Sequence, residues 1–109
     1  MDRLAALYEQ CGQSPWLDNL KRSYVTGGEL RRQIQRGIRG LTSNPTIFQK
    51  AIQGSADYDA QFRDLVAAGG TTIGHYWALV LQDIHGALEQ FAPLYQASNR
   101  GDGYVSVEV

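Results

Sequence analysis

The chain has 109 residues, a hydrophobic content of 43% and a formal net charge of −1, from 10 basic and 11 acidic side chains. These values suit one small globular domain, or part of one, and exclude collagenous, disordered and membrane-spanning proteins. The charge balance and the lack of a basic run argue against nucleic acid as a partner. The single cysteine, Cys11, excludes an internal disulfide and a multi-cysteine metal site, and we expect a cytoplasmic protein.

The first part of the chain predicts a leading helix followed by two strand units. Residues 1–12 mix apolar and charged side chains as an amphipathic helix does, unlike a secretory signal. Residues 14–18 read as a short apolar strand. A helix over 29–36 lies between glycines, and residues 38–42 read as a second strand that ends in a turn sequence. Residues 13–44 therefore form the first two strand units.

Residues 45–102 predict a helical insertion, because the segment is longer than one strand-to-strand connection requires. A helix is expected over 56–68, and a longer one from Thr72, which Pro93 should kink or end early. Residues 103–109 alternate strictly between valines and other residues, which predicts a third strand.

Strands that alternate with helices favour parallel pairing, and thus an α/β fold that is either a barrel or an open sheet. Asp18, Asn44 and Glu108 lie at, or just beyond, the carboxyl ends of the three predicted strands, where α/β barrels build their active sites. Strand parity puts these three residues and Thr42 on one face of the sheet. An alternative is that Asp18 and Asn44 are only cap and turn residues, types that favour strand-to-helix junctions.

Three segments carry a resemblance to a known family. Gly40-Leu41-Thr42-Ser43-Asn44-Pro45-Thr46-Ile47-Phe48 resembles the signature of transaldolases at the end of the second barrel strand. Trp16-Leu17-Asp18-Asn19-Leu20 is similar to the family's first strand, and Gly103-Tyr104-Val105-Ser106-Val107-Glu108-Val109 to its third. The resemblance implies the amino-terminal part of a bacterial transaldolase, with about three parallel strands of a TIM (β/α)8 barrel.

What the resemblance implies about chemistry is the transfer of a dihydroxyacetone unit between sugar phosphates through a lysine Schiff base, without metal or organic cofactor. Asp18 would be the acid and base at the sugar hydroxyl, and Glu108 would act with a catalytic water. Asn44 would hydrogen-bond the intermediate, and Thr42 would line the pocket. A base at the hydroxyl and an electron sink at the adjacent carbon are what cleavage of this carbon–carbon bond requires.

The chain departs from the family in two respects. The Schiff-base lysine of transaldolases lies on the fourth strand and the phosphate-gripping arginine later still, whereas Lys21 and Lys50 are the only lysines here and are expected to be solvated. We therefore expect an inert fragment that pairs with itself or with the rest of a barrel. One alternative is a non-catalytic binding domain derived from the same fold, and another is a complete enzyme that uses Lys50.

Overall fold

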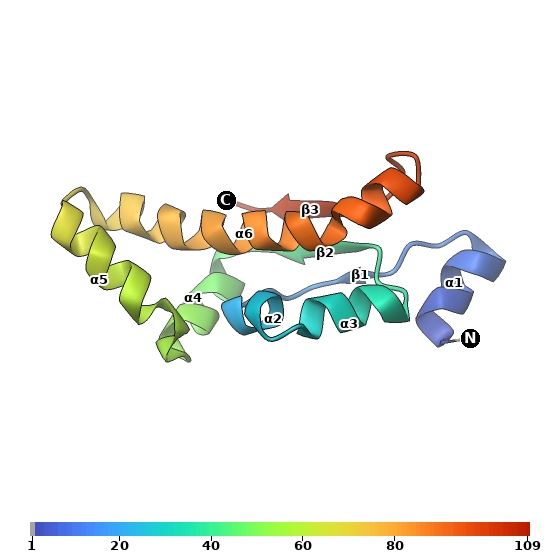
Figure 1. Cartoon of the computed structure of the whole chain (residues 1–109), viewed down its shortest axis with the longest axis horizontal. Helices are drawn as coiled ribbons and strands as arrows, with labels where there is room; N and C mark the ends of the chain where they lie inside the picture. The colour runs from blue at the N-terminus through green and yellow to red at the C-terminus, as the bar shows by residue number, and fades with distance from the viewer. Residues whose placement is uncertain (1) are drawn as a thin grey trace.

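The computed structural model describes residues 2–109 and has an elongated shape of 51 × 23 × 21 Å (Figure 1). Helices separate the three strands along the described chain, and a short 3-10 helix, η1, precedes α5. In chain order the elements are α1 (Arg3–Cys11), β1 (Trp16–Leu17), α2 (Arg22–Thr26), α3 (Glu29–Arg36), β2 (Gly40–Ser43), α4 (Pro45–Gln53), η1 (Ala56–Tyr58), α5 (Asp59–Ala68), α6 (Thr72–Ala97) and β3 (Tyr104–Val107).

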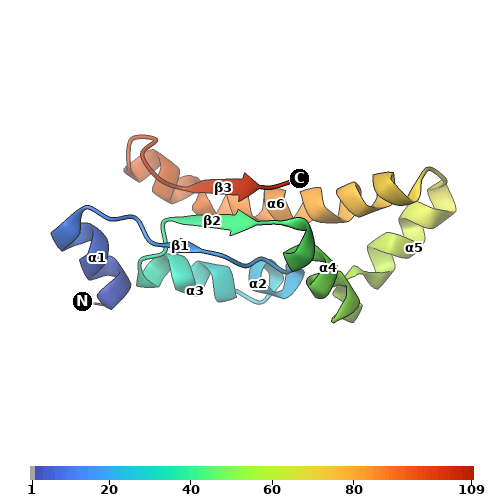
Figure 2. The same cartoon turned by 180° about the vertical axis from the view of Figure 1, so that it is seen from behind.

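The three strands form one parallel sheet in the order β1-β2-β3. Trp16 is paired with Gly40, and Gly40 is paired in turn with Tyr104 on the other side. This arrangement confirms the predicted parallel α/β pattern. Figure 2 shows the strands in front of α2, α3 and α6, so these helices cover one face of the sheet and leave the other face bare.

The covered face contains the hydrophobic core. Leu41 in the middle strand is fully buried, and Val105 of β3 packs against the same cluster. Leu30 of α3 and Phe91 of α6 are also fully buried and contribute from the helix side. Because side chains alternate along a strand, burial of Leu41 and Val105 directs their neighbours in sequence to the bare face.

The bare face carries Trp16, Gly40 and Tyr104 side by side, because these residues are paired across the strands. A side chain at residue 40 would overlap with the indole ring of Trp16, so only glycine allows that ring to lie across β2. The side chains of Trp16 and Tyr104 are 40% and 46% exposed. Large aromatic side chains thus meet solvent on the bare face of the sheet.

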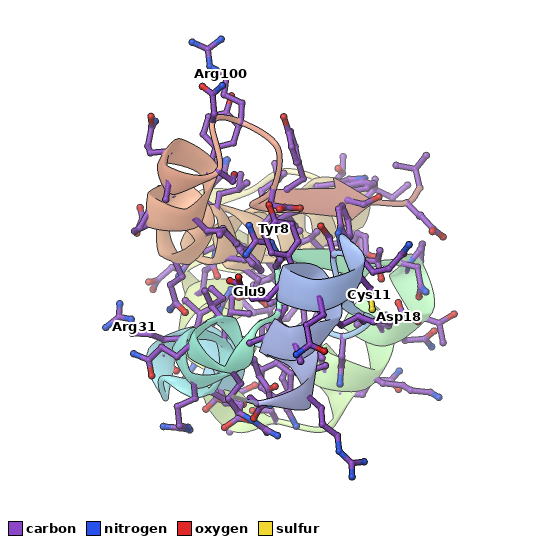
Figure 3. The ribbon with its side chains drawn as sticks, turned by 90° about the vertical axis from the view of Figure 1, so that its right-hand side faces the viewer. Tyr8, Glu9, Cys11, Asp18, Arg31 and Arg100 are labelled. Carbon is purple, nitrogen blue, oxygen red and sulfur yellow. The ribbon has the colours of Figure 1, made fainter. Side chains whose placement is uncertain are left out.

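The helix α1 lies at the amino end of the strands (Figures 1 and 2), and Figure 3 views the molecule from this side, with Tyr8, Glu9 and Cys11 of α1 labelled. The guanidinium of Arg39 lies 3.5 Å from the ring centroid of Tyr8 and its Nε donates to Asp102 at 2.7 Å. Gly37 has a φ of +126° and lies against the backbone of α1. These contacts connect α1 to the residues immediately before β2 and β3.

Two helices were not predicted from the sequence. The first, α2, is only five residues long, and no side chain caps its start. The second, α4, begins with Pro45 directly after Asn44, where the sequence predicted only a turn. Proline suits the first position of a helix, because its missing N–H needs no partner there and its fixed φ is already helical. The turn sequence was therefore also a helix start.

Two boundaries also differ from prediction. The helix α6 continues through Pro93 to Ala97, so the prediction that proline ends it early is wrong. The predicted helix over 56–68 begins as the separate turn η1. Within the segment 45–102, α6 contacts β3, α2 and α3 and buries Phe91 in the core. The interpretation of this segment as an insertion stays a prediction.

Candidate functional site

Asp18 and Thr42 meet at the carboxyl end of the sheet. The hydroxyl of Thr42 donates a hydrogen bond of 2.6 Å to Oδ1 of Asp18. This contact follows from the strand register, because the pairing of Leu17 with Leu41 brings the next residue of each strand together on the opposite, bare face. A hydrogen bond to a carboxylate is shorter and stronger than one between neutral groups, so it fixes the orientation of Asp18. Oδ2 of Asp18 makes no hydrogen bond within residues 2–109.

Asn44 is the N-cap of α4. Its Oδ1 accepts a hydrogen bond of 2.9 Å from the backbone N–H of Ile47, which is the usual use of asparagine at a helix start. Asn44 therefore caps α4, as the alternative reading expected, while its role as a substrate contact stays a prediction. The cap uses only the side-chain oxygen, and the amide nitrogen is left without a hydrogen-bond partner in residues 2–109. A cap and a ligand contact are compatible at this position.

Glu108 follows β3 and extends the parallel ladder by one residue. Its backbone N–H donates to the carbonyl of Ser43 at 3.0 Å, and the hydroxyl of Ser43 donates to the carbonyl of Ser106 at 2.9 Å. The side chain of Glu108 is exposed and makes no hydrogen bond within residues 2–109. The structure thus brings Asp18 and Thr42 into contact, while the convergence of Glu108 with them stays a prediction.

A hollow of about 340 Å³ adjoins Asp18. Its wall comes from the residues after β1 and from one face of α4: Asp18, Asn19, Lys21, Ile47, Lys50 and Ala51. Both lysines are exposed, as predicted. Their position beside Asp18 was missed, because the spacing of residues 47, 50 and 51 points to a shared helix face only once α4 is known to be a helix.

A buried polar cluster holds the segment after Asp18 against α6. Arg22 donates from Nε to Oδ1 of Asp83 at 2.8 Å and from Nη2 to the carbonyl of Leu79 at 3.1 Å. The hydroxyl of Tyr58 donates to Oδ2 of Asp83 at 2.6 Å and accepts from the backbone N–H of Arg22 at 2.9 Å. Burial, and then the nearby Asp83 carboxylate, raise the pKa of Tyr58 well above its ordinary value.

The cluster of Arg22, Tyr58 and Asp83 was not predicted, because it joins three separate elements. The side chains of Arg22 and Asp83 are only 9% and 1% exposed. Their hydrogen bonds therefore compensate for taking two charges out of water. Because Arg22 begins α2 only four residues after Asp18, these hydrogen bonds also hold the segment that follows Asp18 in place.

Within residues 2–109 no group of three or more histidine, cysteine or carboxylate side chains is arranged to hold a metal ion. Among the same residues, none of the helices combines the length and the apolar character that crossing a membrane requires.

Comparison with known proteins matches residues 15–109 to the family described as Transaldolase/Fructose-6-phosphate aldolase. The chain is 50% identical over 102 residues to Transaldolase 2 of Nostoc punctiforme, and 47% identical over 102 residues to the transaldolase of Trichodesmium erythraeum. Each alignment covers 93% of this chain but 27% of the relative. The transaldolase of Thiobacillus denitrificans is 42% identical over 99 residues, which cover 90% of this chain and 28% of that protein. The chain thus spans about a quarter of the length of these relatives.

Proposed function

We propose that this chain, which belongs to the Transaldolase/Fructose-6-phosphate aldolase family, supplies the first three strands of a transaldolase barrel and part of its active site. The reaction converts sedoheptulose 7-phosphate and glyceraldehyde 3-phosphate into erythrose 4-phosphate and fructose 6-phosphate. It belongs to the pentose phosphate pathway and passes through a lysine Schiff base. The observation that best supports this proposal is the 2.6 Å hydrogen bond from Thr42 to Asp18 at the carboxyl end of a parallel sheet.

In this proposal Asp18 moves the proton of the sugar hydroxyl while the carbon–carbon bond breaks. The Thr42 hydroxyl occupies Oδ1, so Oδ2 is the atom that takes up and returns the proton. Glu108 lies two strands away from β1 and acts through a water molecule. The amide nitrogen of Asn44 donates to the bound intermediate while its oxygen continues to cap α4.

Residues 1–109 alone do not catalyse this transfer in our proposal, because they lack a suitable Schiff-base lysine. A nucleophilic lysine must be partly neutral at pH 7, which is favoured by burial at a strand end. Lys21 and Lys50 are both exposed, and neither lies on a strand. The electron sink therefore has to come from other strands of the barrel.

Those other strands are also the partner that we propose for the bare face and the open edges of the sheet. Only one side of β1 and one side of β3 is paired within residues 2–109, and exposed strand edges favour further pairing. Trp16 and Tyr104 would become buried when a barrel closes over them. Self-association through the same edges is the alternative. The proposed location is the cytoplasm, in keeping with the free, exposed Cys11.

The test is a chimaeric enzyme in which this chain replaces the matching segment of Transaldolase 2 from Nostoc punctiforme. We expect it to form erythrose 4-phosphate from sedoheptulose 7-phosphate in a coupled assay, and to be trapped by borohydride with fructose 6-phosphate as a covalent adduct. Asp18→Asn in the chimaera should lower kcat by about 100-fold or more, because general acid–base catalysis contributes roughly 10²–10⁴-fold. The matched control is Asp64→Asn, which removes the same charge from an exposed position on α5.

A folded chimaera without transaldolase activity would contradict the proposed function. Unchanged kcat in the Asp18→Asn chimaera would contradict the role of Asp18 alone. A borohydride adduct on the 109-residue chain by itself, detected by intact mass and located at Lys21 or Lys50 by peptide mapping, would show that this lysine forms a Schiff base. That result would refute the proposed inactivity of residues 1–109.

A further inference from the structure

The hollow beside Asp18 combines both lysines of the chain with polar side chains. Lys21 lies after β1 and Lys50 in the last turn of α4, so two separate segments bring cations to one concave surface. The hollow has a volume of about 340 Å³, which is large enough for a small metabolite. Neither lysine has a role in the catalytic proposal above.

The two ammonium groups are not neutralised by carboxylates. All four ion pairs within residues 2–109 use arginine, and Lys21 and Lys50 take part in none of them. The ammonium of Lys21 lies 5.2 Å from the ring centroid of Tyr24, a cation–π distance that limits where this long side chain points. Asp18 is the only acidic side chain that lines the hollow, so the two lysines give the hollow a net positive charge.

We propose that this hollow binds the phosphate group of a sugar phosphate, with Lys21 and Lys50 as the residues that contact it. The site is a further contact for the substrate class of the proposed function, on which the inference rests. It is separate from the arginine that the transaldolase resemblance assigns to a later strand. Lysine suits this task because its ammonium is a compact cation with three donors for phosphate oxygens.

The charge distribution also sets the orientation of the ligand. The Asp18 carboxylate repels a phosphate but accepts hydrogen bonds from hydroxyl groups. The amide of Asn19 also lines the hollow, and its Nδ2 donates to the hydroxyl of Tyr24 at 3.2 Å. The phosphate therefore lies toward the lysines and the sugar hydroxyls toward Asp18. A sugar phosphate fits the hollow better than an anion without hydroxyl groups.

The experiment is an NMR titration of the 109-residue chain with fructose 6-phosphate, inorganic phosphate and fructose in separate series. Fructose 6-phosphate should shift the backbone amide signals of Asn19 and Ala51, inorganic phosphate should shift them at higher concentrations, and fructose should leave them unchanged. Lys21→Met and Lys50→Met should each raise the Kd for fructose 6-phosphate about threefold to fivefold, the size of one exposed ion pair. Lys50→Arg should keep the affinity, because it preserves the charge.

Arg31→Met is the matched control, because it removes one positive charge from an exposed position of α3. Figure 3 shows Arg31 and Asp18 at opposite sides of the molecule. An unchanged Kd in this variant supports a local site. If Arg31→Met and Lys50→Met raise the Kd equally, the loss of affinity comes from net charge alone, and the proposal is overturned. Signals of Asn19 and Ala51 that do not move with fructose 6-phosphate, or that move equally with fructose, would also overturn it.

This binding test is independent of catalysis. In the active chimaera, Lys50→Met should raise KM for the phosphorylated substrates while kcat stays the same. A chimaera without activity would refute the proposed function and leave the titration result standing. An active chimaera whose KM does not change in the Lys50→Met variant would refute the hollow as a contact for substrate.

Discussion

Asp83→Asn tests the buried cluster that positions the segment after Asp18. The substitution keeps the shape of the side chain but leaves the Arg22 guanidinium, whose side chain is 9% exposed, without a counter-charge. Loss of one member of a buried ion pair costs about 3–5 kcal/mol. We expect the free energy of unfolding to fall by about 3 kcal/mol, the lower end of this range. The reason is that the asparagine oxygen still accepts one of the two hydrogen bonds that Asp83 receives from Arg22 and Tyr58.

Urea unfolding, followed by circular dichroism at pH 7, measures this loss as a difference in the free energy of unfolding. A small domain has about 5–15 kcal/mol in total, so the shift in midpoint should be large. Asp64→Asn, at an exposed position with no hydrogen bond within residues 2–109, should change little. Arg22→Met combined with Asp83→Asn should be more stable than Asp83→Asn alone, because no charge then stays buried. A loss below about 1 kcal/mol for Asp83→Asn would refute the reasoning.

Three further variants test separate features. The raised pKa of Tyr58 means that its phenol stays neutral in the folded chain above pH 10.0, while it ionises in the unfolded chain. Above this pH the free energy of unfolding should therefore fall by up to about 1.4 kcal/mol per pH unit. Tyr58→Phe should remove this contribution, which urea unfolding at alkaline pH would measure. Asn44→Ala should lower the free energy of unfolding by about 1 kcal/mol, because the helix cap is lost. Asn44→Asp should keep the cap and lower only the activity of the chimaera. Equal stability of the two variants would contradict the cap. Gly37→Ala should destabilise the chain by about 2 kcal/mol or more in the same unfolding assay, because φ of Gly37 is +126° and the added methyl group would overlap with the backbone at Ala5. An unchanged urea midpoint would contradict that contact.

The sheet could be predicted because its signals are local. Strand parity alone put Asp18 and Thr42 on one face, and the structure joins them by a hydrogen bond. The order of strands and helices was enough to predict parallel pairing, since consecutive strands that are separated by helices pair in this way. The family was also identified from the sequence, because its motif is a continuous segment around Asn44.

The residues that were missed depend on contacts between distant segments. No local pattern distinguishes Arg22 from an exposed arginine, because its partner Asp83 is 61 residues away. The same reason hid the hollow, whose lysines come from opposite sides of β2 in the sequence. The helix α4 was missed for a different reason, since Asn44-Pro45 is typical of turns as well as of helix starts.

The cluster of Arg22, Tyr58 and Asp83 also sets an order of events during synthesis. Asp83 is added to the chain 65 residues after Asp18, so Arg22 lacks its counter-charge until nearly half of α6 has been made. Contacts of such long sequence separation form late, because closing a long loop costs conformational entropy before the contact is gained. The segment after Asp18 therefore takes its final position only when α6 docks on the sheet, and β3 is then added beside β2.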